Sequence, residues 1–247
     1  MVKPNSISYI LGAGTILPCS TGNPTTSFIG QPPTAVHKDA GFGVNLHTAH
    51  RVMDGHDGGP VSPNAWAPEF TYDGQTGTFY LYWSSRIGDR QVHHYCTTKD
   101  WLTFSTPAVY FDPGFTAIDM TILKEGDTYY AYYKDERNGE KTIRCATSKS
   151  LDPRVQRFEG STPLLPSRYI EVEGPEVFPA IGGKGWFLYF DKFNGDRGVS
   201  YTGCTDPSQH KWYPIPDDEI RNPTEVKHGS VEIISTAELE KLLEHFK

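Results

Sequence analysis

Hydrophobic and polar positions along residues 64–214 follow one pattern that occurs three times. In each copy an apolar strand carries a carboxylate near its start, a polar turn follows, and an aromatic run forms a second strand. Short apolar or aromatic runs separated by turn residues are typical of β-strands. The paired strands are expected at 66–70 and 79–83, at 118–123 and 128–133, and at 173–178 and 186–190.

The length of the repeat indicates the architecture. When Tyr82, Tyr132 and Tyr189 are aligned, successive copies lie 50 and 57 residues apart, and each copy continues into a third strand and a polar turn. Four short antiparallel strands at such a period are typical of a β-propeller blade. A two-sheet sandwich is the alternative, but it does not require an acid to recur at one phase of the unit. Blades are expected at 64–112, 116–165 and 171–214, and a strand at 228–234 begins a further, incomplete blade.

The two ends of the chain differ from this repeat. Residues 1–60 are rich in turn residues, with one plausible strand in 7–17, and we interpret them as an irregular segment that replaces or degrades a first blade. Residues 61–247 form the propeller domain. Near the C-terminus, Ser235 and Glu238 have the spacing of a capping box. They predict a short helix that packs as a lid on the propeller edge through Leu239, Leu242, Leu243 and Phe246.

Composition excludes several classes of function. The net charge is −7 with no basic run, which disfavours nucleic acid, and no apolar stretch reaches the roughly 20 residues that span a bilayer. We expect a monomer without membrane contacts. The N-terminus is a poor signal peptide, so both an extracellular and a cytoplasmic location stay open. The four cysteines include no Cys-x-x-Cys pair, and we interpret Cys96 and Cys145, which fall at equivalent points of successive repeats, as buried free thiols.

Acids on the innermost strands are the candidate chemistry. The first strands of all blades surround the propeller axis, so Asp119 and Glu173 should converge there. A single acid at such a place is most often structural, but two carboxylates within a rim of Trp and Tyr fit glycoside hydrolysis better. The histidines of the N-terminal segment lack metal-ligand spacing, and we interpret them as polar loop residues: His37, His47, His50 and His56.

Four motifs now show a resemblance to a known family. Residues 66–69 (Trp-Ala-Pro-Glu), 118–119 (Ile-Asp), 173–175 (Glu-Gly-Pro) and 228–229 (His-Gly) resemble the blade motifs of family 43 glycoside hydrolases. These are five-bladed β-propellers that include arabinofuranosidases and xylosidases. The resemblance covers roughly residues 60–246. It implies an all-β propeller of the five-bladed glycosidase type, here incomplete, with a short C-terminal helix.

The resemblance also implies residue roles. Glu173 would be the general acid of an inverting mechanism, and Asp119 would set the pKa of that acid and orient it. Trp66, Glu69 and Arg197 would line the sugar pocket. His228 would lie near the axis, where relatives often bind a calcium ion or a water; no cofactor is required, and a structural calcium is the one metal implied. The substrate would be a plant-type polysaccharide or oligosaccharide containing arabinose or xylose.

One departure from the family bears on activity. The family's catalytic base is an Asp of the first blade, usually in Asp-Pro, and residues 1–60 contain no such motif. Asp39 and Asp54 lie in the right part of the chain without matching it. The resemblance therefore implies a glycosidase of the α-L-arabinofuranosidase or β-xylosidase type whose base is not identified. The alternatives are a non-catalytic carbohydrate-binding propeller and a truncated, inactive family member.

Overall fold

Three four-stranded antiparallel sheets form the centre of the molecule in the computed structural model. The structure describes residues 8–11, 15–18, 64–165, 171–180, 185–193, 198–215 and 229–245. Blade A contains β3 (Trp66–Asp73), β4 (Thr78–Ile87), β5 (Arg90–Thr98) and β6 (Ala108–Phe111). Blade B contains β7 (Ala117–Glu125), β8 (Thr128–Asp135), β9 (Ile143–Ser148) and β10 (Glu159–Pro163). Blade C contains β11 (Val172–Pro179), β12 (Trp186–Lys192), β13 (Gly198–Cys204) and β14 (Tyr213–Pro214).

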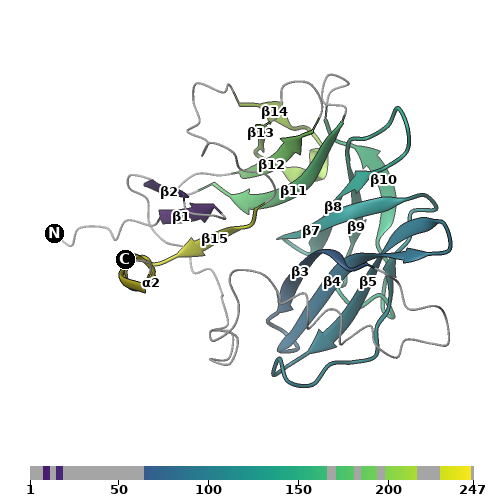
Figure 1. The fold of residues 1–247 in the computed structure, drawn as a ribbon, viewed down its shortest axis with the longest axis horizontal. Helices are drawn as coiled ribbons and strands as arrows, with labels where there is room; N and C mark the ends of the chain where they lie inside the picture. The colour runs from purple at the N-terminus through teal and green to yellow at the C-terminus, as the bar shows by residue number, and fades with distance from the viewer. Residues whose placement is uncertain are drawn as a thin grey trace.

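These sheets confirm the predicted blades and the alignment of their aromatic strands. Strands pair in sequence order within each sheet, and Tyr82, Tyr132 and Tyr189 occupy equivalent positions opposite the first strand of their blades. The first strands β3, β7 and β11 are neighbours across blades and lie toward the middle of the molecule, whereas later strands lie farther out (Figure 1). The fold is an all-β propeller with a short C-terminal helix.

A fourth sheet joins the two ends of the chain. Strand β15 (Val231–Ile234) pairs with β1 (Ser8–Leu11), which pairs in turn with β2 (Thr15–Pro18), all antiparallel. The further blade predicted from the 228–234 strand is therefore a three-stranded sheet within the described residues. The one strand expected in residues 7–17 is thus two short strands, of which the second ends one residue beyond that range, at Pro18. β15 lies beside β11, so this sheet continues the order of the blades (Figure 1).

Two large clusters of aromatic and aliphatic side chains lie between neighbouring blades, and a smaller one, with Leu81, Trp83 and Cys96, lies within blade A. Between blades A and B, Tyr82 and Tyr95 pack with Met120 and Tyr133. Between blades B and C, Tyr132, Ile143 and Cys145 meet Val172, Leu188 and Phe190. Blade B thus packs against blade A on one face and against blade C on the other, so contacts between blades supply most of its buried apolar surface.

The C-terminal helix α2 (Thr236–His245) begins as predicted but does not pack as predicted. The backbone N–H of Ser235 donates to Glu238 Oε2 at 2.7 Å, and the Glu238 N–H donates to Ser235 Oγ at 3.3 Å, which completes the capping box. None of the residues of α2 is buried, and Leu243 is 46% exposed. Leu239 and Leu242 are only partly covered, and Phe246 lies outside the described residues, so the described part of α2 does not show the expected lid on the propeller edge.

No helix within the described residues is long and apolar enough to cross a membrane.

Packing between blades B and C predicts the effect of a core truncation. Leu188 is fully buried, and Leu188→Ala should destabilise the protein by about 2–5 kcal/mol because it removes apolar contacts and leaves a cavity. Leu102 is 74% exposed, so Leu102→Ala should change the free energy of unfolding by less than about 0.5 kcal/mol. Urea denaturation followed by tryptophan fluorescence measures both values. Equal effects of the two substitutions would contradict the inter-blade core.

The cysteines give a second prediction. Cys96 and Cys145 are buried free thiols, as expected, and so is Cys204. Burial raises the pKa of Cys96 and of Cys204 to about 12 and that of Cys145 further. None of the three should react with Ellman's reagent at pH 8 until denaturant is added, because the thiolate is the reactive form. Cys19 lies outside the described residues, so the assay uses Cys19→Ser. Rapid reaction in the native state would disprove the assignment.

Candidate functional site

A β-bulge near the start of each first strand builds the candidate site. The strand pairing shifts by one residue between Trp66 and Glu69, between Ile118 and Thr121, and between Glu173 and Glu176. The first residue of each bulge has a left-handed backbone conformation, with φ of 44° at Ala67, 55° at Asp119 and 57° at Gly174. Such a bulge turns the strand and re-aims the side chains around it, and bulges are common next to active sites.

The bulges correct one expectation from the sequence. Asp119 and Glu173 do not occupy equivalent positions of the repeat. Asp119 is the first residue of the bulge in blade B, whereas Glu173 is the residue directly before the bulge in blade C. The acids at an equivalent position are Glu69 and Glu176, with Thr121 between them in blade B. Side chains of the four residues around a bulge point in different directions. An acid can therefore reach the site from a different position of the bulge in each blade.

Asp119 connects three blades. Its carboxylate Oδ2 accepts a hydrogen bond from the backbone N–H of Gly174 in blade C at 3.1 Å, and its own N–H donates to Ser84 Oγ in blade A at 3.2 Å. Ser84 lies 3.4 Å from Nδ1 of His93, and burial lowers the pKa of His93 to about 3, so that imidazole is neutral. These contacts hold the strained backbone of Asp119 in place next to the residue that follows Glu173.

Glu173 is held from blade B by a lysine. Its Oε2 accepts a hydrogen bond from Lys134 Nζ at 2.7 Å, and the Glu173 side chain is 20% exposed. Lys134 is almost fully buried and also forms an ion pair with Glu136. Lys134 and Ser84 are equivalent residues of β8 and β4, because each lies opposite the residue that precedes its blade's bulge. Each of the two therefore contacts the bulge region of the following blade.

A second group of polar side chains lies farther along the first strands. Tyr82 Oη donates to Glu69 Oε2 at 3.4 Å, Thr121 Oγ1 donates to Glu176 Oε2 at 3.5 Å, and the N–H of Val231 donates to Glu176 Oε1 at 3.1 Å. Burial, and secondly repulsion by Glu176, raise the pKa of Glu69 well above its ordinary value. Glu69 therefore stays protonated to a higher pH than an exposed glutamate does. The protonated form carries no charge and is not repelled by Glu176.

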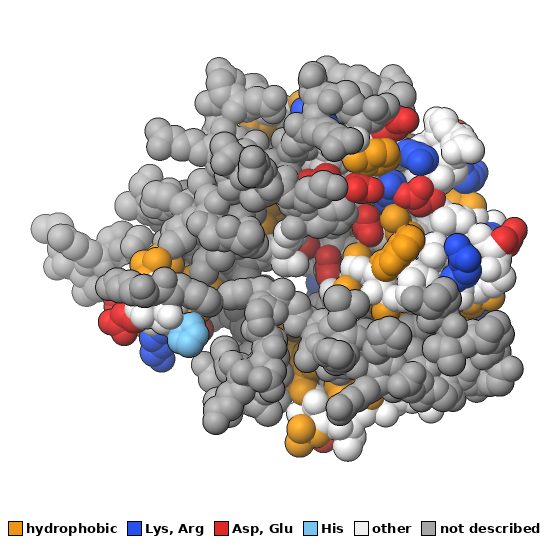
Figure 2. Space-filling view, viewed as in Figure 1, with side chains coloured by type: hydrophobic (Ala, Val, Ile, Leu, Met, Phe, Trp, Pro, Cys, Tyr) orange, Lys and Arg blue, Asp and Glu red, His pale blue; other side chains and the backbone are white. Residues whose placement is uncertain are grey.

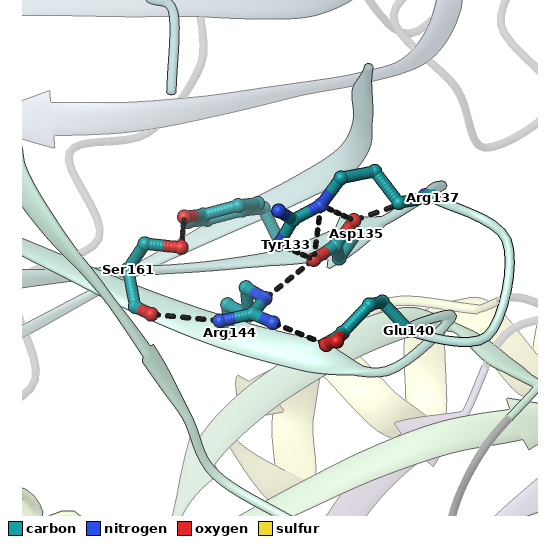
Figure 3. Close-up of polar contacts among 6 residues, drawn as sticks. All are labelled: Tyr133, Asp135, Arg137, Glu140, Arg144 and Ser161. Carbon is teal, nitrogen blue, oxygen red and sulfur yellow. Dashed lines mark hydrogen bonds and ion pairs between the residues drawn. The ribbon is translucent and has the colours of Figure 1, made fainter. Parts of the chain in front are cut away.

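The loop after β8, which carries Glu136 and Lys141, is fixed by a network around Asp135 (Figure 3). The fully buried Asp135 carboxylate accepts from Arg137 Nη2 at 2.6 Å and from Arg144 Nε at 2.5 Å. Arg144 also donates to Glu140 Oε2 at 2.6 Å and to the Ser161 carbonyl at 2.9 Å. Charge-assisted bonds of this kind restrict the loop, so the charges that it brings beside Glu173 occupy defined positions.

The remaining predicted site residues are placed as follows. Trp66 is 50% exposed at the start of β3, equivalent in the repeat to Glu173. Arg197, His228, Asp39 and Asp54 lie outside the described residues. Among the residues that the structure does describe, no group of three or more His, Cys, Asp and Glu side chains is arranged to hold a metal ion. Acidic side chains are visible in the middle of one face, beside a hollow, with Lys and Arg alternating with Asp and Glu next to them (Figure 2).

Sequence reasoning did not identify four of these residues: Ser84, Thr121, Lys134 and Glu176. Two of them carried a usable signal. Glu176 precedes the aligned tyrosine of its blade by the same spacing as Glu69 does. Lys134 is a charged residue directly after the aromatic run of its strand. Their roles depend on contacts between blades, which no spacing along the chain reveals.

Comparison with known proteins agrees with this geometry. Residues 48–240 match the family model described as a probable glycosyl hydrolase domain, a family related to glycosyl hydrolase family 43. The chain belongs to this family. The match includes all three blades and the strand β15, so the family resemblance of the four motifs is confirmed at the level of the whole domain.

Individual relatives are more distant. An α-L-arabinofuranosidase of Bifidobacterium longum subsp. longum is 28% identical over 50% of this chain and 15% of its own length. A fructofuranosidase from Schwanniomyces occidentalis, solved with fructose, is 14% identical, with a TM-score of 0.54 over 63% of this chain and 34% of its own. A thermostable family 43 glycoside hydrolase is 22% identical, with a TM-score of 0.49 over 64% of this chain and 55% of its own. The chain thus spans only part of each relative.

The raised pKa of Glu69 predicts a pH-dependent stability. Between the ordinary pKa of a glutamate and the raised value, the folded state binds more protons than the unfolded state, so wild type should lose stability as pH rises. Glu69→Gln cannot ionise and should gain stability relative to wild type between pH 4 and pH 8, by about 1.4 kcal/mol for each unit of the shift. Thermal unfolding at the two pH values measures this. Glu240→Gln on the exposed face of α2 is the control, and an identical pH dependence of both variants would refute the prediction.

Proposed function

We propose that this chain is a glycoside hydrolase that acts on arabinose- or xylose-containing glycans by an inverting acid/base mechanism. Glu173 is the general acid, and Asp119 orients it. The observation that carries the proposal is the hydrogen bond from the Gly174 amide to Asp119, which couples the two acids across blades. A second carboxylate held against the residue after Glu173 fits glycoside hydrolysis, because that chemistry needs a proton donor and a further carboxylate.

The geometry fits the first half of the reaction. A protonated Glu173 gives its proton to the glycosidic oxygen as the bond between that oxygen and the anomeric carbon breaks. Asp119 holds the backbone directly after Glu173, so the carboxyl group leaves blade C at a defined angle. The Glu173 side chain is partly exposed, which allows a glycan to reach it.

The second half requires a base. In inversion a water attacks the anomeric carbon from the opposite face and gives its proton to a carboxylate about 6.5–9.5 Å from the acid. We keep Asp39 and Asp54 as the candidates, because both precede blade A in the chain.

Substrate class rests on two observations. The arabinofuranosidase relative supports a pentose-containing substrate. Trp66 presents an exposed indole at the position in blade A that is equivalent to Glu173 in blade C, and aromatic faces pack well on sugar rings. Trp66, together with Glu69 and Arg197, is proposed to line the site for a plant-type polysaccharide or oligosaccharide.

One contact favours a second function, a carbohydrate-binding propeller without hydrolysis. Glu173 accepts a hydrogen bond from the ammonium of Lys134, and a carboxylate in an ion pair has no proton to give. A chain that keeps this pair at all times would bind glycans and release them unchanged.

Hydrolysis assays distinguish the two functions. Glu173→Gln keeps the shape of the side chain without a transferable proton, and it should slow cleavage of an unactivated arabinoxylan oligosaccharide by about 10²–10⁴-fold. Nitrophenyl arabinofuranoside and xyloside should be affected less, because their leaving groups need less protonation. Glu159→Gln, on the exposed outer strand β10, is the matched control and should match wild type.

The outcomes separate cleanly. Background rates for wild type and Glu173→Gln alike, together with glycan binding by calorimetry, would replace the enzyme by the binder. Wild-type activity that survives Glu173→Gln on both classes of substrate would mean that another residue is the acid.

A further inference from the structure

The buried charges around Glu173 carry an inference about how its proton is controlled. Lys134 is almost fully buried, and its ammonium lies between the carboxylates of Glu136 and Glu173. The same nitrogen lies 4.2 Å from the centroid of the Phe193 ring, whose face attracts a cation. One positive charge is therefore shared by two acids, only one of which is the proposed general acid.

A repeated contact shows that this arrangement belongs to the bulge architecture. The residue at this position of the second strand contacts the bulge region of the next blade in both described cases, Ser84 with Asp119 and Lys134 with Glu173. Ser84 contributes a neutral hydroxyl, whereas Lys134 contributes a charge. A neutral side chain at position 134 could also donate a hydrogen bond to Glu173, as Ser84 accepts one from Asp119, so the charge itself calls for an explanation.

We propose that Lys134 is a positioning residue that sets the protonation of Glu173, and that Glu136 sets how strongly it does so. When Glu173 takes a proton from solvent, the ammonium of Lys134 keeps its ion pair with Glu136 and its contact with Phe193. The buried cation is then never without a counter-charge. Glu136 thus lets Glu173 become neutral, which is the form that general-acid catalysis requires. This inference rests on the role proposed above for Glu173.

Other charges near Glu173 set the background of its titration. Asp119 of β7 reaches it through Gly174, and Asp191 of β12 lies opposite it in the strand pair. Lys141 Nζ lies 3.7 Å from Glu136 Oε2 and 5.6 Å from the Phe193 ring centroid, so it stabilises the negative charge of Glu136. The Asp135 carboxylate is occupied by Arg137 and Arg144. The ion pair between Lys134 and Glu173 is the contact that the substitutions below change.

The proposal predicts opposite effects for two substitutions. Lys134→Met removes the cation and keeps the apolar stem, so Glu173 should hold its proton to a higher pH than in wild type. Glu136→Gln removes the competing anion, leaves Lys134 to Glu173 alone, and should move the titration of Glu173 to lower pH. Lys134→Arg keeps the charge and should stay closest to wild type. Lys149→Met is the control, because Lys149 bonds Thr128 at the opposite end of β8 and should change nothing.

The experiment measures the proton directly. Protein labelled with carboxyl-¹³C glutamate is titrated by NMR, and the Glu173 signal is assigned by its absence from Glu173→Gln. Midpoints that move in opposite directions support the proposal. Titration midpoints of Glu173 that equal the wild-type value, or that shift in the same direction in Lys134→Met and Glu136→Gln, overturn the proposal. If Lys134→Met does not fold, Glu136→Gln decides alone, since it leaves the Lys134–Glu173 pair intact.

Enzyme assays on the same proteins separate this inference from the proposed function. Where wild type hydrolyses an oligosaccharide, the alkaline limb of its pH–rate profile should follow the NMR midpoint in each variant. Opposite NMR shifts without hydrolysis by wild type would support the control of the Glu173 proton and refute the proposed enzyme. Hydrolysis by wild type with a pH–rate profile that is unchanged in both variants would support the proposed enzyme and refute the control of the Glu173 proton by Lys134 and Glu136.

Discussion

The left-handed bulge at the start of each first strand is the constraint on which the rest of the site depends. An extra residue in one strand of a pair bends that strand and re-aims its side chains. Gly174 adopts the required conformation without strain, whereas Ala67 and Asp119 do so at a cost that their surroundings must offset. At Asp119 the surroundings are visible, because Ser84 and Gly174 bond its backbone and its carboxylate. Strain and catalytic geometry are thus maintained by the same contacts.

The sequence predicted the parts of the structure that depend on local pattern. Strand positions, blade limits and the capping box of the last helix follow from alternation, turn residues and spacing, and all were confirmed. The pairing of β15 with β1 was not predicted, because a strand's partner some 220 residues away leaves no local mark. The lid was wrong for a related reason: an apolar stripe shows that a helix can pack, and it does not show that a surface is there to receive it.

The candidate site divides in the same way. Asp119 and Glu173 stand out in the sequence because an acid among apolar strand residues is conspicuous, and the structure brings them together. Lys134 and Ser84 do not stand out, since a lysine at a strand end and a serine in a strand are ordinary. Their importance appears only when neighbouring blades are assembled and each proves to contact the bulge region of the next blade.

The first strands also show two different ways to bury acids near one axis. Glu69 and Glu176 accept hydrogen bonds from hydroxyls and a backbone amide, and burial together with repulsion by Glu176 raises the pKa of Glu69. Glu173 instead shares a lysine with Glu136, so its charge is balanced without a proton. A carboxyl whose two forms are both compensated can exchange a proton at modest cost, whereas one that is stable only when neutral cannot. This difference, more than burial alone, is the reason why Glu173 and not Glu69 is the acid proposed to transfer a proton.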